Sequence, residues 1–186
     1  MKGFWRVHRR PEPQPLSADL VAALEVAHRF DTAWGTRRPL DGHPSTTLTD
    51  AHDSGPSIRD LCGAVLARAA EGRLLLVTES WSRSAPDPPT RFLTQTQWRV
   101  SDAWCGRERE YRASTLYVSW AHQGSSDLER ILDLATEDSI AARLIPEDVG
   151  WFVTPHFDRI EVTALAVDRI THFENAAVAE GGRVSR

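Results

Sequence analysis

Four segments of the chain repeat apolar residues at the three- and four-residue spacing of an amphipathic helix. In the first of them, Leu20, Leu24, Ala27 and Phe30 fall on one side of the predicted helix. The spacing predicts helices from Ser17 to about Phe30, from Ser57 up to Gly72, from Ser126 through Ala135, and from Ala164 to about Ala179.

Serines stand where three of these helices are expected to begin. Ser17 precedes the first apolar stripe, and a serine side chain can accept a hydrogen bond from the free N–H groups of a first helical turn. Ser57 with Asp60, and Ser126 with Glu129, have the spacing of a capping box. The sequence therefore predicts capped starts for three helices.

Shorter apolar runs lie between the helices and predict strands. Arg73–Thr78 is an almost continuous apolar run, typical of a buried central strand, whereas Ser114–Trp120 alternates. Further strands are predicted at Thr46–Thr49, Phe92–Val100, Arg143–Ile145, Gly150–Thr154 and Phe157–Thr163, the last two as a hairpin around Pro155-His156. Because helices and strands interleave, we expect an α/β or α+β fold, with a mixed sheet of about five strands and about four helices.

Proline and glycine mark the expected limits of the folded unit. The run from Pro11 to Pro15 is a stiff spacer, so residues 1–16 are predicted to be an arm or an edge strand. Residues 17–180 form a single globular domain in this interpretation, and residues 181–186, which begin with two glycines, a flexible tail.

Composition places the chain among ordinary globular proteins. Of its 186 residues 41% are hydrophobic, and only two are cysteines, too few for a disulfide framework. Cys62 lies on the apolar stripe of the second helix and is expected to be a small core residue. No apolar run approaches the ~18 residues of a membrane helix, and no signal peptide is recognised. We therefore expect a cytoplasmic protein without a membrane partner.

Charge is distributed unevenly within a net charge of −4. Residues 1–100 carry 13 basic and 11 acidic side chains, whereas residues 101–186 carry 9 and 15. A protein that binds nucleic acid usually shows clustered basic charge, so we expect no nucleic-acid partner. The acidic second half suits a basic protein partner, although a solvated acidic surface explains it equally well.

The segment from His43 to Pro56 holds the most site-like group of side chains. His43, Asp50, His52 and Asp53 could supply a general base oriented by a carboxylate, or ligands for a metal ion, with His156 or Asp158 joining them. Their spacing matches no standard motif, and a segment rich in Asp, Ser, Gly and Pro also serves turns and helix entry. No nucleophile elbow or phosphate-binding glycine loop is present. Catalysis is thus left undecided, leaning to none, with no cofactor and no metal expected.

Tryptophan is unusually frequent, with seven residues. Trp120 and Trp151 fall in predicted strands and are expected in the core, whereas Trp81, Trp98 and Trp104 lie in or beside loops. Tryptophan is enriched at interface hot spots, so these three are candidate anchors for a partner. The acidic side chains expected to steer that partner are Asp127, Glu129 and Asp158.

Taken in order, four segments resemble an uncharacterised bacterial family, domain of unknown function 3885. They are residues 75–82 (LLVTESWS), 111–119 (YRASTLYVS), 127–132 (DLERIL) and 151–162 (WFVTPHFDRIEV). The resemblance covers about residues 45–179, and the chain departs from it at Phe157-Asp158-Arg159, where the family has a tyrosine and two glycines. It implies a compact α/β domain and assigns no catalytic residue.

Two hypotheses of function follow. The first is a non-catalytic protein-binding domain, an immunity-type protein that blocks a basic toxin domain, or an adaptor. The alternative is a small hydrolase or metal-dependent enzyme that uses the segment from His43 to Asp53.

Overall fold

A computed structural model describes residues 17–34, 42–50, 55–80, 94–97, 115–137 and 139–185. These residues form an α+β fold in which four helices pack against one sheet of eight strands. The helices are α1 (Ala18–Trp34), α2 (Ile58–Ala69), α4 (Ser126–Thr136) and α5 (Val167–Ala179). The strands are β1 (Ser45–Thr49), β2 (Arg73–Ser80), β3 (Thr94–Gln97), β4 (Thr115–His122), β5 (Ala141–Pro146), β6 (Trp151–Pro155), β7 (Ile160–Ala164) and β8 (Arg183–Ser185).

The sheet is larger and more regular than the sequence predicted. Its order is β3-β4-β2-β5-β6-β7-β1-β8, and every described pairing is antiparallel. The expected mixed sheet of about five strands is therefore corrected to eight antiparallel strands, while the expected helix number of about four is confirmed. The predicted arm over residues 1–16 lies outside the described residues.

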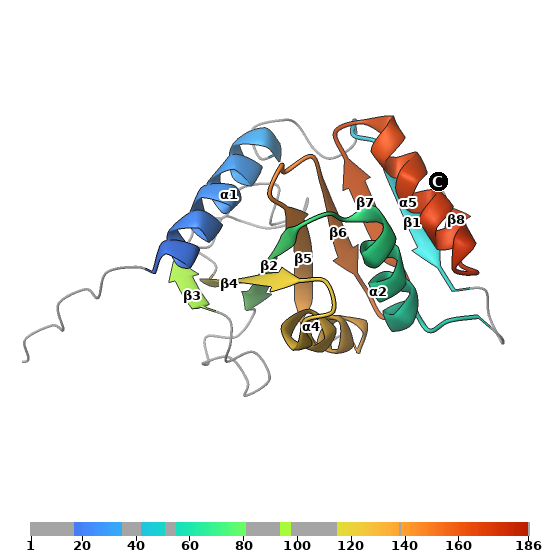
Figure 1. Ribbon diagram of the computed structural model, residues 1–186, viewed down its shortest axis with the longest axis horizontal. Coiled ribbons are helices and arrows are strands. Elements are labelled where there is room, and N and C mark those ends of the chain that lie inside the picture. The colour runs from blue at the N-terminus through green and yellow to red at the C-terminus, as the bar shows by residue number, and fades with distance from the viewer. Residues whose placement is uncertain are drawn as a thin grey trace, which may run out of the picture.

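Helices cover the two sides of the sheet unequally. Leu74 and Leu76 of β2 face the core under α2, α4 and α5, and Leu75 and Val77 face the core under α1. Burial on both sides explains the almost continuous apolar run that predicted this central strand. Figure 1 shows α2, α4 and α5 in front of the sheet, and α1 lies toward the end of the sheet that holds β3 and β4.

The core under α1 is aromatic. Phe30 stacks on Trp34 with ring centroids 5.8 Å apart, and both rings meet Phe152 of β6 edge to face. The indole N–H of Trp34 donates to the carbonyl of Val149 at 3.0 Å, which satisfies the one polar atom of a buried ring. Trp151 is buried as expected, against Phe173, whereas Trp120 is half-buried and donates to the carbonyl of Asp19.

Two predicted helix starts are confirmed and one is shifted. Ser17 accepts from the N–H of Leu20 and Ser57 from that of Asp60. In α4 the cap is Ser125, whose hydroxyl accepts from the N–H of Leu128, so Ser126 is the first helical residue instead. Gly124 has a positive φ of +70° and turns the chain just before the cap. The helix is therefore capped one residue earlier, at Ser125, than the capping-box pattern predicts.

The end of the chain is a strand instead of a flexible tail. Gly181 adopts φ +83°, its N–H donates to Val178, and the N–H of Gly182 donates to Ala177, which together form a Schellman turn. This turn reverses the chain so that β8 pairs with β1. The two glycines that suggested fraying are the residues that direct the last strand onto the sheet.

The last hairpin and helix also differ from their expected limits. Pro155 belongs to β6, and the turn comprises His156 to Arg159, closed by the N–H of His156 donating to the carbonyl of Arg159 at 2.8 Å. The predicted helix start at Ala164 is wrong, because Ala164 is the fully buried last residue of β7. Helix α5 begins at Val167. Among the residues that the structure describes, no helix has both the length and the apolar character needed to cross a membrane.

Candidate functional site

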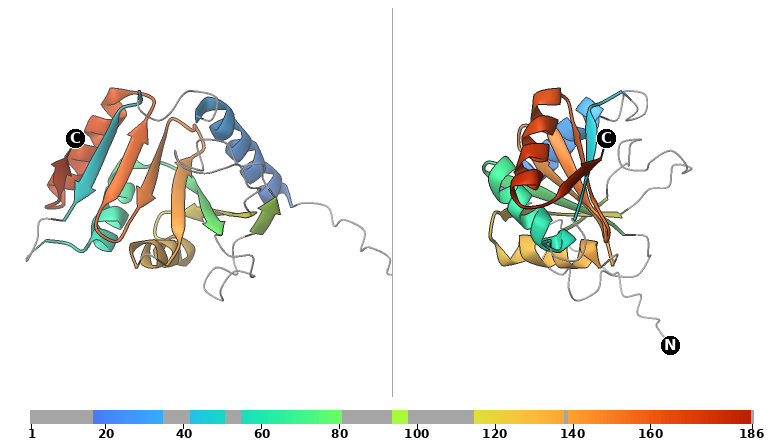
Figure 2. Two further views of the ribbon diagram at one scale, coloured as in Figure 1. Left: turned by 180° about the vertical axis from the view of Figure 1, so that it is seen from behind. Right: turned by 90° about the vertical axis from the view of Figure 1, so that its right-hand side faces the viewer.

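The half of the sheet that α1 leaves uncovered is polar. Ser45 and Thr47 of β1 lie opposite Thr163 and Glu161 of β7, so these four side chains project from one side of the sheet, which we call the open face. The apolar partners between them, such as Val162, point to the core under α5. Seen from behind, β7 and β1 have no described helix in front of them (Figure 2), whereas Ile145 of β5 and Phe152 of β6 pack in the core under α1.

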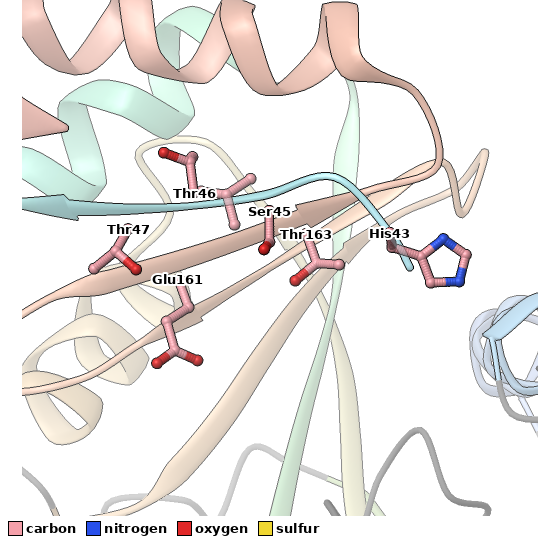
Figure 3. A pocket seen from close by; sticks show the side chains of 7 residues that line it. His43, Ser45, Thr46, Thr47, Glu161 and Thr163 are labelled. Carbon is pink, nitrogen blue, oxygen red and sulfur yellow. The ribbon is translucent and has the colours of Figure 1, made fainter. Parts of the chain in front are cut away.

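A pocket of about 490 Å³ lies on the open face. It is lined by His43, Ser45, Thr46, Thr47, Glu161, Val162 and Thr163. Figure 3 shows Ser45, Thr47, Glu161 and Thr163 on the same side of the two strands, with Thr46 turned to the other side. The hydroxyl of Thr46 donates to the carbonyl of Ser185 at 3.4 Å, so it helps to hold β8 while the other side chains line the pocket.

His43, one of the residues that line the pocket, packs against a buried tryptophan. His43 lies just before β1, and its ring centroid is 4.8 Å from that of Trp34 at a tilt of 53°. Because Trp34 is itself fixed by Val149 and Phe152, the half-buried imidazole has a rigid support. Helix α1 thus supports a lining residue of the pocket through Trp34, its last residue, which is itself buried.

Glu161 supplies the charge of the pocket. Its Oε1 accepts from Nε of Arg159 at 2.9 Å, and its Oε2 lies 3.4 Å from Nε2 of His156. The His156 imidazole and then the Arg159 guanidinium lower the pKa of Glu161 from 4.5 to about 2, against the opposing effect of partial burial. Glu161 is therefore a carboxylate at neutral pH.

The contact between His156 and Glu161 is electrostatic in character. Nε2 of His156 is shielded from solvent and has no hydrogen-bond partner of good geometry within the described part of the chain. At 3.4 Å from the carboxylate, the nitrogen is placed for an ion pair when the imidazole is protonated.

The structure describes two of the four predicted catalytic residues, and these two lie apart. His43 and Asp50 lie at opposite ends of β1, about 20 Å apart at ~3.3 Å of rise per residue. His52 and Asp53 lie outside the described residues. His156 and Asp158 lie in the β6–β7 turn, toward the Asp50 end of β1 and away from His43.

Metal ligands do not gather elsewhere in the described ranges, where no three His, Cys, Asp or Glu side chains converge. Cys62 is buried, and burial raises the pKa of its thiol to about 12, so it is not a ready nucleophile.

The predicted binding residues do not form one surface with the pocket. Asp127 and Glu129 belong to α4 on the opposite side of the sheet, where Glu129 pairs with Arg59. Asp158 lies in the β6–β7 turn and accepts from Arg159 at 3.0 Å. The candidate anchors Trp81, Trp98 and Trp104 fall outside the described residues.

Sequence reasoning missed the residues that line the pocket. Ser45, Thr47 and Thr49 alternate with inward-facing residues, and Glu161 and Thr163 alternate with apolar ones. The sequence signal for the pocket was this period of two, in which hydroxyl side chains take the outward positions that charged residues usually occupy. That the two rows lie side by side depends on the pairing of β1 with β7, which the sequence pattern does not specify.

No family model, curated protein or solved structure matches the chain. The resemblance to domain of unknown function 3885 stays a prediction, and the functional argument rests on the residues themselves.

Proposed function

We propose that this chain is a non-catalytic protein-binding domain of the cytoplasm, an immunity-type protein or an adaptor, and that the open face receives its partner. The observation that supports the proposal is the uneven covering of the sheet. One half of a side is packed under α1, while the other half is hollowed and lined by Ser45, Thr47, Glu161 and Thr163.

A polar sheet face alone is common in antiparallel sheets, so the pocket is what favours binding. Its side chains are fixed by strand pairing, and its one carboxylate is held by two neighbours of the β6–β7 hairpin. Fixed polar groups lose little conformational entropy when a partner arrives, which favours binding. The His43–Asp53 enzyme gains no such support, because His43 and Asp50 diverge along β1.

The partner is best sought with matched variants of the protein as bait. Ser45→Tyr fills the pocket with a residue that strands accept. Asp127→Asn removes a charge from α4 on the far side of the sheet and tests the acidic surface expected from the sequence. Wild-type protein and both variants are immobilised, and the proteins that each one retains from cell lysate are compared by mass spectrometry.

We expect a protein retained by the wild type and by Asp127→Asn, and lost with Ser45→Tyr. A protein lost with Asp127→Asn and kept by Ser45→Tyr would move the interface to α4. If the wild type retains nothing that an unrelated acidic bait does not, the protein-binding function is wrong.

A further inference from the structure

The lining of the pocket is selective in charge. Of its seven residues, Glu161 is the only carboxylate, and none is arginine or lysine. The hydroxyls of Ser45, Thr47 and Thr163 can accept hydrogen bonds from N–H donors. An anion would meet a carboxylate with no arginine or lysine in the lining to offset it, so the pocket favours a cationic group.

The neighbours of Glu161 leave room for a further donor. Arg159 occupies Oε1 with its Nε, and its Nη1 is directed to Asp158 at 3.0 Å. Asp158 and Glu161 thus share one guanidinium, and the His156 imidazole lies 3.4 Å from Oε2 of Glu161. A carboxylate offers about four lone-pair positions, and its own hairpin uses only part of them. The Glu161 side chain is 44% exposed, which leaves it accessible to a partner.

The opposite end of the pocket suits the same class of ligand. His43, whose ring is tilted against that of Trp34, gives an aromatic surface beside the hydroxyls. Guanidinium groups stack on aromatic rings and form directed bonds to carboxylates, so both ends can engage a basic segment. From His43 to Thr47 the pocket follows β1 for about 13 Å at ~3.3 Å per residue, the span of about four extended residues.

We propose that the pocket receives an extended basic segment of the protein partner, with an arginine or lysine side chain against Glu161 and Thr47. This inference rests on the proposed function and specifies the chemistry of the partner. It agrees with the unequal charge of the chain, whose second half is acidic. The hydroxyls of Ser45 and Thr163 then accept from the N–H groups of the segment.

The test is a titration followed by two-dimensional amide NMR. The probe is the acetylated and amidated tetrapeptide of alternating glycine and arginine, and its controls carry glutamine or glutamate in place of arginine. Agmatine serves as a free guanidinium without a peptide backbone. The proteins compared are the wild type, Glu161→Gln, Thr47→Val and, as the matched charge control, Glu71→Gln in the exposed turn before β2.

We expect the arginine peptide to shift amides of residues 45–47 and 161–163 in the wild type and in Glu71→Gln. Glu161→Gln should weaken its binding at least tenfold, and Thr47→Val should weaken it several-fold with the sheet intact. If Glu161→Gln fails to fold, Thr47→Val decides. Equal binding of the glutamine peptide, wild-type affinity in a folded Glu161→Gln, or shifts only elsewhere would overturn the proposal.

The agmatine titration distinguishes a basic protein segment from a small free amine as the source of the cation. Agmatine that binds as tightly as the peptide would replace the protein segment by a small amine and overturn that part of the proposal. Failure of the titration alongside a partner lost with Ser45→Tyr would reject the basic segment alone. A successful titration without any retained partner would instead reject the protein-binding function.

Discussion

At the scale of single residues, Glu161 joins the β6–β7 turn to the open face. Its carboxylate is held by Arg159 and His156, and Thr47 stands directly opposite it on β1. Cross-strand neighbours lie about 5 Å apart, so this charge borders the hydroxyl row directly. The acidity of Glu161 is therefore linked to both the stability of the hairpin and the electrostatics of the pocket.

The depressed pKa of Glu161 predicts a defined pH dependence. A carboxyl whose pKa is about 2 in the folded chain and 4.5 when unperturbed stabilises the fold above pH ~4.5 and loses that contribution as the pH falls through 2. Because the side chain is 44% exposed, solvent screening limits the effect to about 1 kcal/mol. Glu161→Gln should be less stable than the wild type by that amount at pH 7 and pH 5.

Urea unfolding at pH 7, 5 and 3 measures this gap. It should be at least as large at pH 5 as at pH 7 and narrow by more than half at pH 3, while Glu71→Gln stays within about 0.5 kcal/mol of the wild type at pH 7 and 5. A gap of the same size at all three pH values would show that the carboxylate is not held by its neighbours.

The candidate site was predictable only in its parts. The alternation of Ser45, Thr47 and Thr49 indicates a row of hydroxyls on one side of a strand. The alternation of Glu161 and Thr163 indicates a second row. Their meeting depends on a pairing across more than a hundred residues, which no local pattern encodes. Within the predicted His43–Asp53 grouping, an extended strand carries His43 and Asp50 apart, although they are close in sequence.

At the scale of elements, two serine substitutions at the start of α4 test whether Ser125 caps the helix in place of Ser126. Replacing Ser125 with alanine should cost about 1 kcal/mol, because the N–H of Leu128 loses its acceptor. Ser126→Ala should leave the stability within about 0.5 kcal/mol, since Ser126 is the first helical residue and exposed. Thermal unfolding of the two variants measures both effects. The reverse order would restore the capping box at Ser126 and Glu129.

The turn into β8 provides a second test. A Cβ at Gly182 would lie 2.9 and 3.0 Å from the methyl carbons of Leu61 and 3.1 Å from the carbonyl of Ala177. We expect Gly182→Ala to destabilise the fold by about 1–3 kcal/mol, because neither neighbour can withdraw freely.

Gly63 in the middle of α2 is the matched control. A Cβ there would meet only Leu132, at 3.9 Å, so Gly63→Ala should stabilise the helix by about 0.5–1 kcal/mol. Denaturant titration of both variants gives the comparison. A neutral Gly182→Ala would mean that the chain does not approach α2 this closely.

Elements with a strong internal period were predicted well from the sequence, and those fixed by distant partners were not. The stripe of α2 and the central run of β2 carry their own signal. Residues 183–185 carry almost none, because three residues become a strand only when β1 offers them an edge. The Schellman turn at Gly181 and Gly182 was misread because two glycines serve loops and helix ends alike.

At the scale of the whole molecule, the fold is an antiparallel sheet with α2, α4 and α5 on one side and α1 on the other. Interleaved helices and strands predicted the mixture of elements, but not the strand order, which joins β1 and β8 from opposite ends of the chain. This order places β7 and β1, whose polar side chains form the open face, where α1 does not cover them. The open face is thus a consequence of topology, and the function proposed for it is a property of the folded chain.

The most direct test of that function is the threonine-methyl NMR spectrum of the labelled protein with and without its retained partner. Thr47 and Thr163 report on the open face, and Thr136 reports on α4 across the sheet. We expect the partner to shift or broaden the methyl signals of Thr47 and Thr163 and to leave that of Thr136 unchanged. Changes at Thr136 with Thr47 and Thr163 unaffected would contradict the central claim that the open face binds the partner.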